Sequence, residues 1–292
     1  MNRKHFLKLM ASTPLLLGGM TLNSLESCTS SYSHSPKMPV LFLGHGHPMN
    51  ALLDNEFTQK LGKLGRELET PNAIMVISAH WETRGTYVSV NANPHTIYDF
   101  GRFDDRLFNI KYEPQGHPEF AQEVIQLGQD FHIQTDHKMG LDHGAWTVLK
   151  FLYPEANIPV FQLSMDYTKG PQYHFALAKA LQKLRRKGVL IIGSGNIVHN
   201  LRRLNWNDIH AKPFDWAVEF DETVKAHLIS GDYNPLINYQ NLGHLAKMAI
   251  PSNDHYLPML YTLGLAEKDD QIEQLYEGIQ YGSISMRCFK LA

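Results

Sequence analysis

The sequence predicts a single α/β domain over residues 38–292, with a central, mostly parallel or mixed sheet covered by helices on both faces. Short apolar segments rich in β-branched residues alternate with longer segments of helical spacing, which is the pattern of this fold class. From Met38 onward, no change of composition, repeat or low-complexity segment marks a second domain. The hydrophobic residues, 43% of a chain of 292, are enough for a core of this size.

The predicted strands differ in how they are buried. Four segments are almost continuously apolar and are closed by Gly, Ser or His, as expected for strands covered on both faces. These four segments are residues 39–43, 73–79, 158–164 and 188–194. Residues 86–92 (TYVSVNA) alternate between apolar and polar side chains and are predicted to form an edge strand. Residues 281–289 are predicted to close the sheet.

The predicted helices lie between these strands and carry apolar residues at helical spacing. The segment 171–187 also has clear ends, because Pro171 stands at its start and Gly188 follows its last residue. The full set of predicted helices is 50–68, 117–130, 171–187, 213–230 and 255–265.

Residues 1–27 have the pattern of an export signal and are excluded from the fold. Arg3, Lys4 and Lys8 precede an apolar stretch that is too short for an ordinary membrane-spanning helix. The string NRKHFLK is similar to a twin-arginine signal, with Lys4 in place of the second arginine. We therefore expect an exported protein, with an unprocessed cytoplasmic N-terminus as the alternative.

The segment that follows the export signal predicts a tether. LESC, ending at Cys28, resembles a lipoprotein cleavage box, although Glu26 is an unusual residue there. Residues 28–37 are rich in serine and are predicted to be a flexible linker. The two alternatives are a periplasmic protein and a protein anchored to the membrane through a lipid on Cys28.

Charge and cysteine content exclude several classes of function. The formal net charge is -2, and the basic run at 183–187 falls on a helical pattern, so we expect no nucleic-acid partner. Cys28 and Cys288 are the two cysteines, which excludes a metal site built from several thiolates.

Histidines are placed at the ends of the predicted strands. His45 and His80 directly follow two of the apolar segments, and His199 comes shortly after a third. Because ligands bind at the carboxyl ends of the strands in such sheets, these side chains are expected to converge. His143, in LDHGAW, and His255, in NDHYLPML, lie in short polar contexts outside any apolar run. The sequence therefore predicts one site shared by several of its 16 histidines.

The chemistry of such a site has two main alternatives. Imidazole binds Zn, Fe, Cu and Ni, so residue type alone does not select the metal. Three histidines with open positions can activate water on zinc, or hold Fe(II) with room for a substrate and O2. The sequence has no HExxH helix, P-loop or GxSxG motif, so the functions that depend on those motifs lose their usual signature.

Six ordered motifs resemble one family of enzymes. They are LFLGHGHPMN (41–50), SAHW (78–81), TIYDF (96–100), LDHGAW (141–146), SGNIVHNL (194–201) and DHYLPMLY (254–261). Together they resemble the class III extradiol ring-cleaving dioxygenases, and most closely the branch called 4,5-DOPA dioxygenase extradiol. The resemblance covers essentially all of residues 38–292.

The resemblance implies roles for five histidines. It makes His45, His80 and His255 metal ligands, and His143 the acid–base residue. It places His199 beside the metal, either as a further ligand or as a contact to the substrate. The implied cofactor is Fe(II), which Zn(II) can replace in purified protein.

The resemblance also implies a substrate pocket around the metal. His47 stands where the family usually has serine, and it is expected to line this pocket. Tyr98 and Asp99 are expected near the substrate, in a loop over the pocket. Asp254 replaces the family's usual glutamate before a ligand, a change that we expect to be neutral.

The sequence and the resemblance together predict a non-haem Fe(II)-dependent extradiol dioxygenase. Its partners are a small catechol, DOPA-like, and O2. A zinc-dependent hydrolase that uses the same histidines is the alternative enzyme, and a binding protein of the same fold is the non-enzymatic alternative. The presence of His143 beside a complete ligand set argues against the binding protein.

Overall fold

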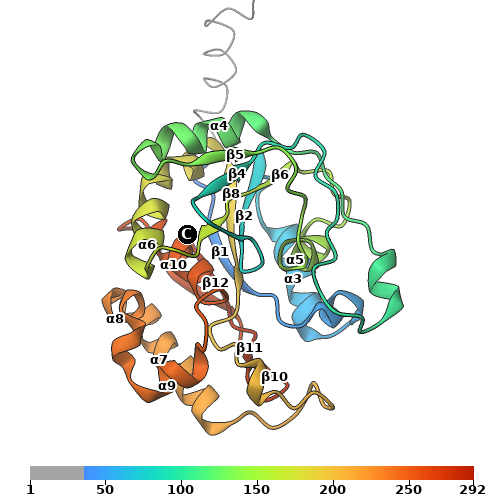
Figure 1. Ribbon diagram of the computed structural model, residues 1–292, viewed down its shortest axis with the longest axis vertical. Helices are drawn as coiled ribbons and strands as arrows, with labels where there is room; N and C mark the ends of the chain where they lie inside the picture. Colours follow the sequence, from blue (N-terminus) through green and yellow to red (C-terminus); the bar gives the residue numbers. More distant parts are fainter. Residues whose placement is uncertain (1–35) are drawn as a thin grey trace, which may run out of the picture. The chain divides into compact units, whose positions relative to one another are not determined.

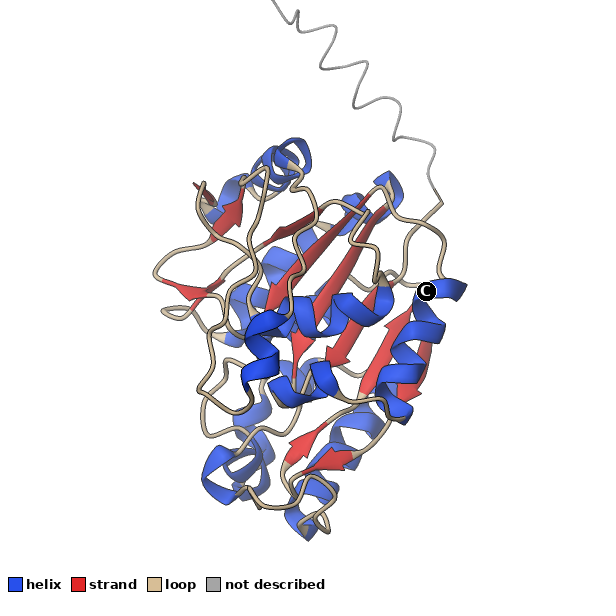
Figure 2. Ribbon diagram, turned by 90° about the vertical axis from the view of Figure 1, so that its right-hand side faces the viewer, coloured by secondary structure: helices blue, strands red, loops and turns tan. Residues whose placement is uncertain are grey.

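The computed structural model describes residues 36–292, which form one α/β domain (Figure 1). A central mixed sheet is flanked by helices on both faces (Figure 2), which confirms the predicted fold class. The predicted export signal and all but the last two residues of the predicted tether lie outside the described residues. Within 36–292, every helix is too short or too polar to cross a membrane.

The central sheet has six strands in the order β6-β2-β8-β1-β12-β9. The first four are mutually parallel and correspond to the four predicted apolar segments. They are β1 (Val40–Gly44), β2 (Ala73–Ser78), β6 (Val160–Gln162) and β8 (Val189–Gly195). The last two are antiparallel to their neighbours and are β12 (Cys288–Leu291) and β9 (Ile272–Tyr276).

Two strand predictions are corrected by the structure. The segment 86–92 is not an edge of the central sheet, since β4 (Tyr87–Ser89) pairs with β5 (Gln134–Asp136) in a separate two-stranded sheet. The segment 281–289 contains β11 (Ile284–Ser285), which pairs with β10 (Ile279–Gln280), and the start of β12. The edge beyond β12 is β9, whose exposed and half-buried side chains lack a continuous apolar run. The remaining short pair is β3 (Glu82–Thr83) with β7 (Met165–Asp166).

Five helices form within the five predicted segments. They are α3 (Glu56–Glu67), α4 (Pro118–Leu127), α6 (Pro171–Ala180), α7 (Asp215–Ser230) and α10 (Leu257–Gly264). The segment 50–68 is broken, because Asn55 and Thr58 form a capping box that starts α3. The segment 171–187 tightens into a 3-10 helix, η4 (Gln182–Lys187), before it ends at Gly188.

Three helices were not predicted: α5 (His143–Leu152), α8 (Asn234–Ile237) and α9 (His244–Ala249). The most important is α5, which is buried over most of its circumference and therefore shows no polar face in the sequence. The other short 3-10 helices are η1 (Pro48–Leu52), η2 (Asp105–Asn109), η3 (Gln129–Phe131), η5 (Leu201–Arg203) and η6 (Tyr239–Leu242).

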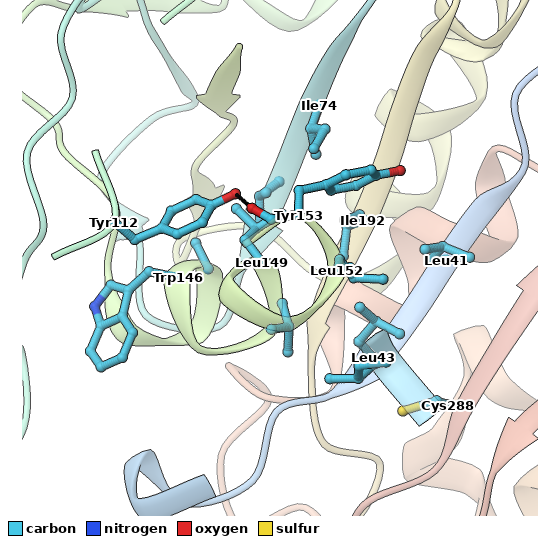
Figure 3. Close-up of a cluster of buried hydrophobic side chains, with 14 of the residues drawn as sticks. Leu41, Leu43, Ile74, Tyr112, Trp146, Leu149, Leu152, Tyr153, Ile192 and Cys288 are labelled. Atoms are coloured by element: carbon cyan, nitrogen blue, oxygen red, sulfur yellow. Dashed lines mark hydrogen bonds between the residues drawn. The ribbon is translucent and has the colours of Figure 1, made fainter. Parts of the chain in front are cut away.

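The main core lies between the sheet and α5. Leu41 and Leu43 of β1 lie on the same side of the sheet as Leu149 and Leu152 of α5 (Figure 3), and all four are buried. Burying each such side chain contributes roughly 1.5–3 kcal/mol. Helix α3 packs on α5, whereas α6 and α10 pack together, with α10 against β8 and β1. These contacts hold the ends of the parallel strands in place.

Two glycines of α3 provide a matched test of this packing. A Cβ at Gly65 would lie 1.9 Å from the carbonyl oxygen of Leu152, whereas a Cβ at Gly62 would meet its nearest atom at 3.5 Å. We expect Gly65→Ala to lower the free energy of unfolding by about 1–3 kcal/mol through overpacking. Gly62→Ala should leave stability unchanged or raise it by up to about 1 kcal/mol, because alanine favours the helix. Urea unfolding of both variants measures the difference, and equal stabilities would contradict this packing.

Candidate metal centre

The parallel strands bring two of the predicted ligands to one edge of the sheet. His45 directly follows β1, and its backbone N–H donates to the carbonyl of Gly195 at the end of β8. His80 lies two residues beyond the end of β2. The turn after His45 needs glycine, because Gly46 has φ +63° and a Cβ there would lie 2.4 Å from the sulfur of Met286.

His255 and His143 reach the same edge from helices. The carbonyl of His255 accepts a hydrogen bond of 2.8 Å from the backbone N–H of Asn196, just beyond β8, and α10 begins two residues later. His143 is the first residue of α5, whose N-cap is Asp142. The buried Asp142 carboxylate accepts from Ala145 and from the Ser78 hydroxyl, which ties this helix start to β2.

The rings of His45, His80 and His255 lie close to one another. Their centroids are 5.1 Å apart for His45 and His80, 5.3 Å for His45 and His255, and 4.9 Å for His80 and His255. The Nε2 atoms of His45 and His80 are 3.1 Å apart. This near-equal spacing fits three bonds of about 2.0–2.1 Å from ring nitrogens to a single ion.

An oxygen atom lies near the other nitrogen of each of these rings. The Ser194 hydroxyl donates to the carbonyl of Gly144, so it accepts from Nδ1–H of His45 at 3.0 Å. Nδ1 of His80 is 3.5 Å from a carboxylate oxygen of Asp99. Nδ1 of His255 contacts the Asp254 carboxylate. Such partners fix the ring orientation and leave Nε2 with the lone pair that a metal needs.

Burial favours the neutral form of three of the site histidines. It is the main cause that lowers the pKa of His45, His80 and His199, and the neighbouring histidines lower it further by charge repulsion. Neutral imidazole is the form that binds metal ions. The donor set therefore fits a divalent metal that accepts nitrogen ligands.

His143 lies beside the ligands and is oriented by Asp99. Its ring packs against that of His80 with centroids 3.8 Å apart. Asp99 accepts from the backbone N–H of His143 at 2.8 Å and contacts Nδ1 at 3.0 Å. Ligand atoms of His45, His80 and His143 lie within 4.8 Å of one another, so His143 is also placed for ligation. Its contact with the Asp99 carboxylate and its position at a helix start suit proton transfer as well.

His199 stacks on His255 with ring centroids 3.4 Å apart and planes inclined by 10°. His199, Asp254 and His255 also offer ligand atoms within 4.8 Å of one another. Because imidazole binds an ion in the plane of its ring, two parallel rings at this separation cannot both direct a nitrogen at one ion. In this arrangement, His199 lies beside the set of three histidines, and ligation by it requires one ring to turn.

These histidines form the floor of a cavity of about 640 Å³. His47 lines the cavity, and its ring packs edge-on against Phe103 with centroids 4.3 Å apart. Its Nδ1 accepts a hydrogen bond from the backbone N–H of Met49, so this nitrogen is not free to bind a metal ion. Burial, followed by the charge of His143, lowers the pKa of His47 to about 4, so this wall is uncharged at neutral pH.

The residues expected over the pocket have other contacts. Tyr98 is not among the residues that line the cavity, because its hydroxyl donates to the carbonyl of Ile110 and its ring packs near Phe108. Asp99 contacts His143 and His80 rather than the open cavity. The supporting role of Ser194 was not predicted, since a serine in GSGN has no distinctive signal in the sequence.

The fold and the histidine centre define a metal-dependent enzyme of the ring-opening dioxygenase class. Residues 29–287 match the family described as the catalytic LigB subunit of aromatic ring-opening dioxygenase, and the chain belongs to this family. The described histidine cluster agrees with the metal dependence of the family.

Two curated relatives share the name of one enzyme. The chain is 44% identical over 257 residues to a 4,5-DOPA dioxygenase extradiol of Escherichia coli (strain K12), covering 86% of this chain and 94% of the relative. It is 37% identical to a protein of the same name from Beta vulgaris, covering 85% and 94%. The predicted resemblance is confirmed, and the chain is an enzyme of the extradiol dioxygenase class.

A solved structure agrees with the fold. The crystal structure of an uncharacterized protein from Escherichia coli K12 has a TM-score of 0.76 and 40% sequence identity to this chain. The match covers 87% of this chain and all of the other.

Removal of one ligand tests the centre. We expect His45→Ala to abolish stoichiometric metal binding, and Ser194→Ala to weaken metal affinity about 10–100-fold because the ring of His45 loses its partner. His210→Ala, at an exposed site, is the matched control. Metal content after dialysis and competition with a chelator measure both effects. Unchanged metal content in His45→Ala would contradict the assignment.

The metal-free protein should be less stable at low pH. In the folded state the pKa values of the buried histidines lie below 6.5, so below that pH the unfolded chain binds more protons than the folded one. The free energy of unfolding should therefore decrease as the pH falls from about 6.5 toward 4, and stay level above that range. Urea titrations in EDTA at pH 7.5, 6.0 and 5.0 measure the slope; an increase in stability on acidification would reverse the predicted sign.

Proposed function

We propose that this enzyme is a non-haem Fe(II)-dependent extradiol dioxygenase that opens the ring of a catechol with O2. The observation that carries the proposal is the arrangement at the cavity floor. The rings of three histidines lie within 5.3 Å of one another, and a fourth histidine beside them is oriented by a carboxylate.

The donor set supports iron. Fe(II) held by His45, His80 and His255 would supply the redox chemistry by which a catechol reacts with O2. The same donors also suit Zn(II), which has no redox chemistry of its own, so the choice of metal decides between oxidation and hydrolysis.

His143 has the surroundings of a general acid–base group. Asp99 holds Nδ1, which leaves Nε2 as the nitrogen that can take a proton from a catechol hydroxyl and return it later. Burial raises the pKa of Asp99, but its hydrogen bond to His143 and the charge of that residue outweigh burial and lower it overall. The carboxylate therefore stays ionised and can stabilise a protonated imidazole.

The walls near His143 suit a flat aromatic substrate. Phe100 lines the cavity and packs edge-on against His143, with ring centroids 5.4 Å apart. Phe103 and His47 form a second aromatic contact in the same cavity. These surfaces can hold a catechol ring by stacking and keep bulk water from the reacting oxygens. The names of the curated relatives support a DOPA-like catechol.

Anaerobic reconstitution tests the reaction. We expect residues 38–292 loaded with Fe(II) to consume one O2 per catechol after air is admitted and to form a yellow ring-opened product. The Zn(II)-loaded protein should be inactive with O2. His143→Ala should bind Fe(II) as the wild type does but react about 10²–10⁴-fold more slowly, since it lacks the acid–base group.

The controls separate the parts of the proposal. Equal metal content in wild type and His143→Ala excludes loss of iron as the cause of a slow rate. Absence of O2 uptake with every catechol of a panel that includes DOPA, despite stoichiometric Fe(II), would refute the proposed reaction. Equal rates for His143→Ala and wild type would refute the role of this residue alone.

A further inference from the structure

The cavity has more space than a catechol ring needs. Its volume is about 640 Å³, whereas a cavity of ~150 Å³ is large enough for benzene. The histidines occupy only one part of the lining, and the outer part includes Leu201, Arg202 and Trp206, to which the ring-opening reaction gives no role. This part of the cavity is available to a substituent of the ring.

Exposed apolar side chains gather along this part of the lining. Phe103, Leu201 and Trp206 all line the cavity, although 47%, 46% and 52% of their surfaces are exposed to solvent. Large apolar side chains that are left in water around one opening are typical of a ligand-binding surface. They come from the segment after Phe100 and from the segment after β8.

Arg202 is the cation of this surface. Among the described residues that line the cavity, it alone has a permanent positive charge. Its backbone is held in η5, where its N–H donates to the side chain of Asn200 at 3.1 Å. Within residues 36–292 its guanidinium has no ion pair, whereas Arg185 and Arg287 each pair with carboxylates.

The acids of the cavity do not neutralise this charge. Asp254 and Glu82 both line the cavity, but no ion pair joins either to Arg202 in the described chain. The Asp254 carboxylate is committed to His255. Arg202, which has no ion pair within residues 36–292, therefore lines the same cavity as the exposed aromatic rings, and the planar donors of its guanidinium match the two oxygens of a carboxylate.

We propose that Arg202, Phe103 and Trp206 form a subsite that selects catechols whose ring substituent ends in a carboxylate. The aromatic side chains cover the apolar part of the substituent, and Arg202 binds its anionic end. The inference rests on the proposed function, because it assumes that the catechol ring lies at the histidine centre. It makes Arg202 a specificity-determining residue rather than a catalytic one.

Turnover of matched substrates tests the selection. The Fe(II)-loaded enzyme would be given 3-(3,4-dihydroxyphenyl)propionate, the uncharged 4-propylcatechol and the cationic dopamine. For Arg202→Gln we expect KM to rise about 10-fold or more with the propionate, because a charged hydrogen bond is lost, and less than about 2-fold with 4-propylcatechol. The rate constant kcat should change little with either. Arg203→Gln is the matched control, since Arg203 lies on the same turn but does not line the cavity.

Binding of unreactive phenols provides a test that does not require ring opening. Titration calorimetry of the metal-loaded protein would compare 3-(4-hydroxyphenyl)propionate with 4-propylphenol, neither of which is a catechol. Wild type and Arg203→Gln should bind the propionate more tightly than the neutral phenol, and Arg202→Gln should lose this preference.

The outcomes separate the subsite from the reaction. Equal binding of both phenols by wild type, or an equal loss in Arg202→Gln and Arg203→Gln, would overturn the subsite while turnover of 4-propylcatechol still supports ring cleavage. A preference for dopamine over 4-propylcatechol would assign the charge selection to Glu82 and also overturn the proposal. A carboxylate preference that depends on Arg202, without turnover of any catechol, would support the subsite and refute the proposed reaction.

Discussion

The parallel register of β1, β2 and β8 is the constraint on which the metal centre depends. Leu43 pairs with Ser194 and Ser78 also pairs with Ser194, so the three strands end at the same level. Residues that follow these strands must therefore meet at one edge of the sheet. The packing of α5 and α10 against the strands then brings His143 and His255 to the same place. A shift of one strand by one residue would turn its side chains to the opposite face and separate the ligands.

Burying several imidazoles is unfavourable in free energy, and hydrogen bonds from a small set of polar groups offset this cost. Buried polar atoms without partners are strongly unfavourable, and the Nδ1 atoms here find Ser194, Asp99 and Asp254. Asp99 has two tasks, since it holds the ring and the backbone of His143 and lies near His80. These hydrogen bonds offset the cost of burying the imidazole rings, and they also fix the orientation of the rings. Stability and chemistry at this edge thus depend on the same hydrogen bonds.

The cavity has two parts with different physical character. Its floor consists of buried histidines whose pKa values are lowered by burial, which suits metal binding and proton transfer. Its outer lining has exposed aromatic side chains and the guanidinium of Arg202, which has no ion pair in the described part of the chain; this suits recognition of a substituent. Recognition and reaction can therefore change independently, because substitutions in the outer lining leave the ligand set and its hydrogen bonds in place.

The sequence by itself determined the four parallel strands, the α/β class and the positions of the histidines at strand ends, because buried strands carry a local signal of continuous hydrophobicity. It did not reveal α5, whose nearly complete burial removes the polar face that marks most helices. The orientation of His143 by Asp99, the stacking of His199 on His255 and the contact of Tyr98 with Ile110 were decided only by the tertiary structure. These contacts join residues far apart in the chain or depend on the direction of a side chain, and neither property leaves a pattern in the order of residues.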